Sequence, residues 1–182
     1  YPAGSAGEVD STKLRLFFYP IGETGVRRIY STTPLQNWSM VIPPNAIVPF
    51  AAYYPSANTF LPTDWSSFAV MPHSHLLCQS IIYYAVKPGI DTIPLVKINK
   101  WDFRWQYYYT YLNPVHLSAG TTIQVFGTFD NTNQNPNNPY HPPQVITQGN
   151  GVESMKTTEE MFQFIFTYVP YQAGDEKIDL RR

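Results

Sequence analysis

Charge and cysteine are both scarce in this sequence, and each shortage excludes classes of protein. Only 14% of the 182 residues are charged, with 12 basic against 13 acidic side chains. The chain therefore has no basic surface for nucleic acid and no polybasic run for an anionic membrane. One cysteine, Cys78, excludes an intrachain disulfide framework. The longest apolar runs, such as 81–86, are too short for a transmembrane helix, so we expect a chain that buries its core without cross-links.

Helical periodicity is also missing, and short apolar segments separated by turn residues dominate. Aromatic residues reach 16%, and there are 17 prolines, which suits short strands joined by rigid turns. The segments expected to form strands are 13–19, 38–42, 47–54, 65–71, 73–86, 92–98, 121–129 and 161–169, with an aromatic block at 101–111. They predict an all-β fold, an antiparallel jelly-roll β-sandwich of about eight or nine strands.

The remaining segments predict a single domain with one long loop. We expect one domain over 1–182, with poorly packed ends at 1–12 and 175–182. The segment 130–143 is rich in Asn and Pro, so it should be an irregular, exposed and mobile connection.

Two of the four histidines stand at alternate positions of an expected strand. The side chains of His73 and His75 should then point to one face, about 6.6 Å apart along the chain. Imidazoles at that spacing can bind one metal ion, whereas adjacent residues could not. The simpler alternative is a pair of surface or half-buried histidines without a ligand.

Met161 is the candidate third ligand. In the strand that follows it, one face is aromatic and expected to fill the core, through Phe162, Phe164, Phe166 and Tyr168. Met161 belongs to the other face, so it need not be a core residue, although a gap-filling methionine is the ordinary alternative. A thioether with two imidazoles suits copper, especially Cu(I), better than zinc.

Six segments in order carry a resemblance to a known family. They are 72–77 (PHSHLL), 101–106 (WDFRWQ), 114–121 (PVHLSAGT), 129–132 (FDNT), 135–139 (NPNNP) and 157–161 (TTEEM). Together they resemble the C-terminal, catalytic-copper domain of the copper type II, ascorbate-dependent monooxygenases. This is the family of peptidylglycine alpha-hydroxylating monooxygenase and dopamine beta-monooxygenase, and its bacterial relatives are more similar still.

The resemblance implies a site, a reaction and partners. His73, His75 and Met161 match the family's ligands of one catalytic copper ion. The implied reaction is hydroxylation of a C–H bond in a small organic or peptide-like substrate by dioxygen, with ascorbate or another electron donor. The family's second, electron-delivering copper lies in an N-terminal domain, and the opening segment 1–4 resembles the sequence that follows it. We therefore expect the C-terminal part of a larger design, partnered by such a domain or subunit, and a secreted, periplasmic or cell-surface location.

The sequence also departs from the family pattern. Met71 stands where the peptide-amidating members have an arginine for the substrate carboxylate, and Gln163 and Ile165 replace further substrate contacts. A peptidyl-glycine substrate is therefore not expected. The alternative function is a non-catalytic jelly-roll subunit that binds or assembles in an exported complex or filament, since low charge and many tyrosines suit packing against other chains.

Other candidate residues carry weaker signals. His116 precedes a turn and His141 lies in the Pro-rich segment, so both are expected at the surface. Cys78 should be a core thiol on the face opposite the histidines. Trp101 and Trp105 can stack on a planar substrate, but aromatic segments of this kind more often build a sandwich core.

Overall fold

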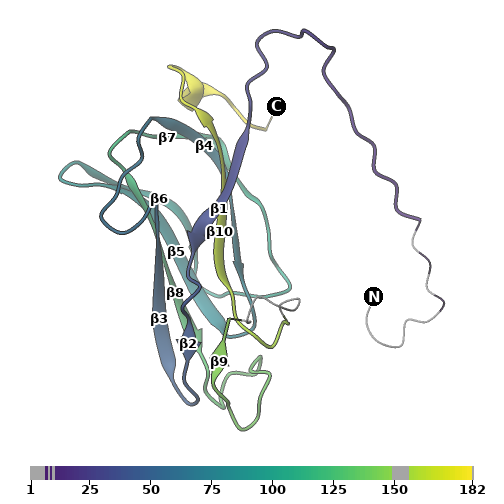
Figure 1. Ribbon diagram of the computed structural model, residues 1–182, viewed down its shortest axis with the longest axis vertical. Helices are drawn as coiled ribbons and strands as arrows, with labels where there is room; N and C mark the ends of the chain where they lie inside the picture. Colours follow the sequence, from purple (N-terminus) through teal and green to yellow (C-terminus); the bar gives the residue numbers. More distant parts are fainter. Residues whose placement is uncertain (1–6, 8, 10, 149–155, 182) are drawn as a thin grey trace.

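The computed structural model describes residues 7, 9, 11–148 and 156–181, and their regular structure is almost entirely β (Figure 1). One sheet has the order β1 (Tyr30–Gln36), β10 (Phe162–Pro170), β4 (Trp65–Ser74) and β7 (Tyr109–Leu117). The other has the order β3 (Ile47–Tyr54), β8 (Thr122–Asp130), β5 (Cys78–Lys87) and β6 (Asp91–Ile98). A short pair, β2 (Val41–Ile42) and β9 (Ile146–Thr147), lies at one end, and η1 (Asp175–Lys177) is a 3-10 turn near the C-terminus. All these strand pairs are antiparallel, which confirms the predicted all-β sandwich; the jelly-roll connectivity stays a prediction.

The core lies between the two four-stranded sheets and is largely aromatic. Alternate residues of β10 point inward, as predicted, and Phe162 and Phe164 are fully buried. The Phe162 ring meets Phe129 of β8 edge-on at 5.4 Å, and the Phe164 ring stacks on Tyr83 of β5 at 5.8 Å. Because the period-2 pattern sends these rings inward, the intervening side chains of β10 are left on the outer face of the sheet.

Two of the predicted strands are wrong, and a third, 38–42, is a strand only at Val41–Ile42 (β2). The stretch 73–86 is not one strand, because β4 ends at Ser74, residues 75–77 bend, and β5 begins at Cys78 in the other sheet. The segment 13–19 alternates like a strand but has no strand partner in the described chain and is exposed throughout. The aromatic block 101–111 is irregular up to Tyr109, where β7 begins.

The 130–143 segment is irregular, as predicted, but the expected exposure is wrong for three of its five asparagines. Asn131, Asn135 and Asn138 are buried. The Asn131 amide nitrogen donates to the carbonyls of Ile42, Pro43 and Gln144 at 3.1, 3.0 and 2.8 Å. This irregular stretch cannot form the backbone hydrogen bonds of a β-sheet. Asparagine side chains provide hydrogen bonds instead, because their amides can satisfy backbone carbonyls at a turn. Its mobility stays a prediction.

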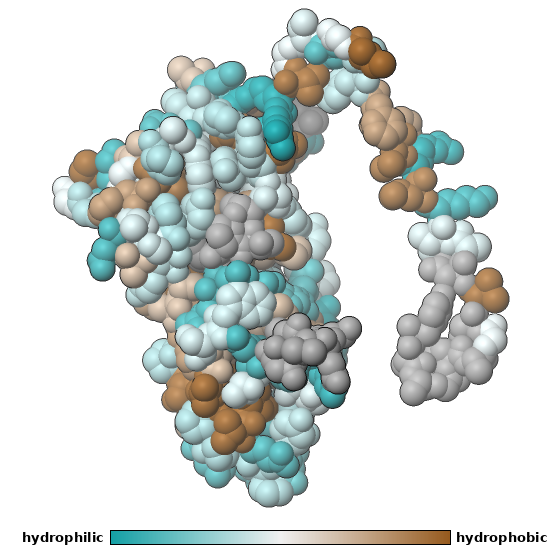
Figure 2. All heavy atoms as spheres, viewed as in Figure 1, coloured by the Kyte–Doolittle hydropathy of each residue, from teal (hydrophilic) through white to brown (hydrophobic). Residues whose placement is uncertain are grey.

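The two ends behave differently from each other. Residues 11–29 form an arm that curves away from the sandwich (Figure 1), and apolar side chains lie at its surface (Figure 2). Leu14, Phe17 and Phe18 are 82–86% exposed. Most of the expected loose end at 1–12 lies outside the described residues. The prediction of a poorly packed 175–182 is wrong for Asp175, which is buried and forms an ion pair with Arg27 at 2.6 Å. No helix in the described ranges is long and apolar enough to cross a membrane.

Candidate metal centre

The three predicted ligands come together where β4 ends and β10 begins. These strands are neighbours, with His73 opposite Gln163, so Met161 arrives beside His73 from the start of β10. The His73 Nε2 atom lies 3.2 Å from the Met161 Sδ atom. The His75 ring lies 5.2 Å from the His73 ring, centroid to centroid, at 89°. Metal binding by these three side chains stays a prediction.

Their meeting does not follow from the strand geometry that suggested it. Only His73 is inside β4; His75 is one residue past its end, in the bend before β5. His73 is half-buried and His75 is buried, with 5% exposed. The bend therefore turns the second imidazole toward the first at the edge of the core.

Oxygen atoms face the Nδ1 atom of each histidine. His73 Nδ1 is in hydrogen-bond contact with the Gln106 side-chain oxygen, and His75 Nδ1 donates to the Glu159 carbonyl at 2.8 Å. Histidines that bind metals commonly donate the other ring N–H in this way, because the bond fixes the tautomer and the ring orientation. Burial lowers the pKa of His75, so its imidazole is neutral near pH 7, the form that ligates metals.

Glu160 fixes the bend at the backbone. Its carboxylate is fully buried and accepts N–H bonds from His75, from Leu77 at 2.9 Å and from Met161 at 2.9 Å. Two of these three donors are the main chains of candidate ligands. Burial raises the pKa of Glu160 to about 7 against the opposing effect of the three N–H groups. The sequence analysis missed this residue; the only signal was an acidic pair just before an apolar strand.

The 101–106 segment covers the two histidines. Trp101 is buried, as the core alternative predicted, and its indole N–H donates to the His75 carbonyl at 3.2 Å. The Phe103 ring meets the His75 ring edge-on at 5.5 Å. Trp105 is 66% exposed and does not belong to the core. This segment, called the cover loop below, therefore contributes to the site by contacts that its composition did not predict.

The other candidate residues lie away from this centre. His116 stands at the opposite end of β4, paired with Asp64 at 2.7 Å and stacked on Tyr171 at 3.8 Å. His141 is exposed and bonded to Asn133 at 2.9 Å. Cys78 is a buried free thiol whose pKa is raised by burial, which confirms a core role.

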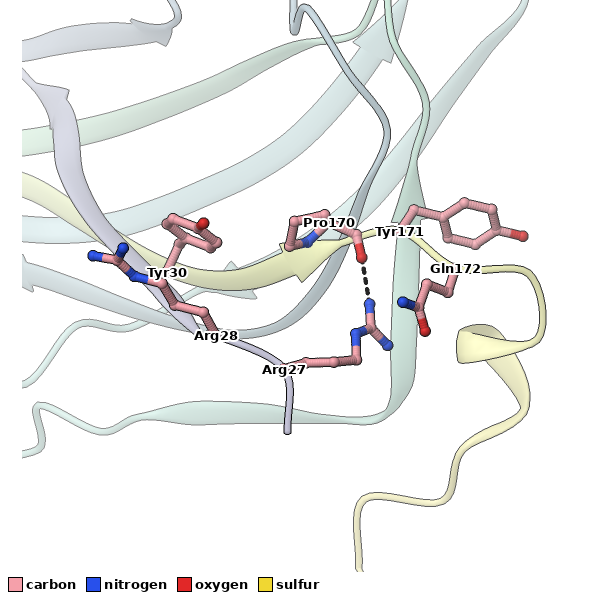
Figure 3. Close-up of a pocket in the computed structure, with 6 residues that line it drawn as sticks. All are labelled: Arg27, Arg28, Tyr30, Pro170, Tyr171 and Gln172. Atoms are coloured by element: carbon pink, nitrogen blue, oxygen red, sulfur yellow. Dashed lines mark hydrogen bonds between the residues drawn. The ribbon is translucent and has the colours of Figure 1, made fainter. Parts of the chain in front are cut away.

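One pocket of the structure lies away from the histidines. A pocket of about 270 Å³ lies at the far end of β10 and is lined by Arg27, Arg28, Tyr30, Pro170, Tyr171 and Gln172 (Figure 3). Its Arg27 guanidinium is already paired with Asp175. The pocket therefore belongs to the packing of the chain ends and not to the candidate centre.

The donor set fits copper better than other common metals. In the described part of the chain, no three His, Cys, Asp or Glu side chains gather as a metal site would require. The third donor here is instead the thioether of Met161, a soft ligand that zinc, magnesium and calcium sites rarely use. Two neutral imidazoles and one thioether thus suit a copper ion that cycles between Cu(I) and Cu(II).

Comparison with known proteins agrees with this chemistry. Residues 26–141 match the family model for the C-terminal domain of copper type II ascorbate-dependent monooxygenases. Since this match covers more than half of the chain, the chain belongs to that family, whose description makes it dependent on copper and ascorbate. The match includes His73 and His75 and ends before Met161. No curated protein matches the sequence.

Proposed function

We propose that this chain is the catalytic-copper domain of a monooxygenase that hydroxylates a C–H bond of a small organic or peptide-like substrate. The observation that carries the proposal is the approach of His73 Nε2 to Met161 Sδ, with His75 beside them, in a member of a copper monooxygenase family. His73, His75 and Met161 would hold the ion. When bound, copper supplies the activation of dioxygen, which the protein's own side chains cannot perform.

The protein's residues hold the ligands in the form that copper requires. Nδ1–H bonds to Gln106 and Glu159 keep those protons away from the candidate ligand atoms. The buried carboxylate of Glu160 holds the His75 and Met161 backbones in register. Because these groups are placed before the metal arrives, little reorganisation accompanies binding.

The surface beside the centre favours a substrate without a carboxylate at this point. Met71 and Ile165 are opposite each other on β4 and β10, two residues from His73 and Gln163. Neither side chain can pair with an anion, so the family's arginine contact has no substitute at Met71. This supports a neutral or apolar substrate group next to the copper.

Electron supply requires a partner. Hydroxylation by dioxygen consumes two electrons and two protons and gives the hydroxylated product and water. A single copper ion held by His73, His75 and Met161 would supply one of the two electrons. The described residues offer one candidate centre, so the second electron comes from elsewhere. We therefore propose an electron-delivering copper domain or subunit, with ascorbate or another reductant, in a secreted, periplasmic or cell-surface setting.

Titration of the 182-residue chain with Cu(I) and Cu(II) tests the proposal. We expect one copper per chain, and we expect His73→Ala or His75→Ala to abolish stoichiometric binding. Met161→Ile should weaken Cu(I) more than Cu(II), because it removes a soft ligand at similar volume. His116→Ala and His141→Ala are matched controls, since these histidines lie outside the centre, and they should bind copper as the wild type does.

The alternative function is favoured by one observation. The exposed apolar arm at 11–29 suits a non-catalytic subunit that packs against other chains of an exported complex or filament. If the wild type takes up no copper, or if a variant lacking both His73 and His75 binds as well as the wild type, this alternative becomes the better one.

A further inference from the structure

Gln106 in the cover loop contacts His73 in a way that decides where the imidazole proton sits. The Gln106 side-chain nitrogen donates to the Phe103 carbonyl at 3.0 Å. Its oxygen must therefore face His73, and an amide oxygen can only accept. The Met161 sulfur, 3.2 Å from His73 Nε2, is also only an acceptor but a weak one, whereas the amide oxygen is a strong one. The stronger acceptor therefore favours the proton on His73 Nδ1, which leaves Nε2 without a proton on the side of Met161.

We propose that Gln106 is a positioning residue that locks His73 in its Nδ1–H tautomer and so presents Nε2 to the metal. This rests on the proposed function for its consequence, because the locked nitrogen is a candidate copper ligand. The tautomer itself is a property of the metal-free chain. Gln106 is separated from His73 by 33 positions, so the contact depends on the fold.

The cover loop is held firmly enough to do this. At its start, the Trp101 backbone N–H donates to Gln79 at 2.8 Å, and the Trp101 indole donates to the His75 carbonyl. Within the loop, Trp105 N–H donates to the Asp102 carbonyl at 2.9 Å. Beyond it, Tyr109 enters the β7 ladder opposite Val70 of β4. With both ends fixed to the strands around the site, Gln106 reaches His73 with little loss of side-chain freedom.

The strength of the hydrogen-bond acceptor at position 106 should also affect the reduction potential and the affinity of the bound copper. A stronger acceptor on Nδ1–H makes Nε2 more electron-donating, and this favours Cu(II) over Cu(I). Gln106→Glu offers a carboxylate acceptor and should lower the Cu(II)/Cu(I) reduction potential. Gln106→Leu offers no acceptor, so His73 is free to change tautomer and lose alignment. Loss of such partners costs about 10–100-fold in metal affinity.

The first experiment uses the metal-free chain and nitrogen-15 NMR of the histidine side chains. We expect Nδ1–H at His73 in the wild type and in Gln106→Glu, and a shift toward Nε2–H in Gln106→Leu. Gln124→Leu, the same change on the distant strand β8, should leave His73 unaltered. Nε2–H at His73 in the wild type, or an unchanged tautomer in Gln106→Leu, overturns the proposal.

The second experiment adds copper. We expect Gln106→Leu to lower Cu(I) affinity by about 10–100-fold and Gln106→Glu to retain binding at a lower reduction potential. If Gln106→Leu binds Cu(I) with the affinity of the wild type, the proposed effect of Gln106 on metal binding is wrong. If the wild type itself binds no copper, the proposed function fails, while the NMR result still decides whether Gln106 sets the tautomer.

Discussion

Asp175→Asn should remove the main link between the C-terminal segment and the sandwich. The Asp175 carboxylate accepts two bonds from Arg27 at 2.6 and 2.9 Å, one from the Ser66 hydroxyl at 2.6 Å and one from Gln172 N–H at 2.9 Å. Arg27 leads into β1, and its guanidinium also donates to the Pro170 carbonyl at the end of β10 (Figure 3). One carboxylate therefore ties together the segments before β1, at the start of β4 and after β10.

The expected loss of stability follows from this geometry. Asparagine keeps one acceptor oxygen and turns an NH₂ group toward donors, so the Arg27 charge loses its partner. Removing one side of a buried pair costs about 3–5 kcal/mol. Arg27 is 27% exposed and can recover some hydration, so we expect a loss of about 3 kcal/mol. That corresponds to a fall in Tm of roughly 6–12 °C for a domain of this size.

The loss should depend on pH in a defined direction. The bond from Arg27, above all, holds the pKa of Asp175 well below its usual range, and the Ser66 hydroxyl and Gln172 N–H add to this against the effect of burial. A carboxyl with a lower pKa in the folded chain stabilises the fold fully above its unfolded pKa of about 4, and less as the pH falls. The gap between wild type and Asp175→Asn should therefore be widest above about pH 5 and shrink below about pH 4.

Urea unfolding followed by tryptophan fluorescence, at pH 7 and pH 3.5, measures both effects. Asp179→Asn is the matched control, because Asp179 pairs with Arg181 at 2.8 Å where Arg181 is 72% exposed. Such surface pairs contribute at most about 1 kcal/mol. The reasoning is refuted if Asp175→Asn costs no more than the control, or if its cost is the same at both pH values.

Two further changes test the packing of the core and the 130–143 loop. Gly127→Ala should cost about 1–3 kcal/mol in thermal unfolding, because an added Cβ would lie 2.6 Å from Phe162 Cε2 and 2.9 Å from Phe129 Cε2. Adding Phe162→Leu should recover part of that loss. If Gly127→Ala is as stable as the wild type, the sheets are not closely packed there. Asn131→Ala should lower the free energy of unfolding by about 2–4 kcal/mol, since it removes the donor to the buried carbonyl of Ile42 and to the part-buried carbonyls of Pro43 and Gln144. The exposed Asn133→Ala should cost under about 0.5 kcal/mol, and equal effects of the two would contradict a structural role for Asn131.

Side-chain alternation predicted strands well only where a neighbouring strand was available. The 47–54 segment coincides with β3, and the last strand was placed within one residue. The 13–19 segment has the same pattern and no partner strand in the described chain. Conversely, β1 has a weak pattern but pairs with β10, with Ser31 opposite Thr167. Alternation specifies which side chains lie on the same face. A strand also requires hydrogen bonds to a neighbouring strand, and whether such a neighbour exists depends on the whole fold.

Buried polar residues were the part of the structure that the sequence could not supply. Asn131, Asp175 and Glu160 lie in polar segments whose composition indicates surface, yet all three are buried. Each is buried because it satisfies particular backbone or side-chain groups of segments distant in the chain. These hydrogen-bond partners are brought together by tertiary contacts, so no local sequence pattern predicts them.

The wrong strand over 73–86 and the candidate metal site have the same physical cause. When the chain leaves β4, the N–H groups of His75 and Leu77 turn inward where no ladder can receive them, and a buried N–H without an acceptor is costly. Glu160 accepts both and also the N–H of Met161. The carboxylate therefore ends the strand one residue before His75 and, by the same bonds, joins that residue to the start of β10. Glu160 thus explains both results: its bonds end the strand that the sequence predicts to continue, and they hold His75 beside the start of β10, where the candidate ligand Met161 lies.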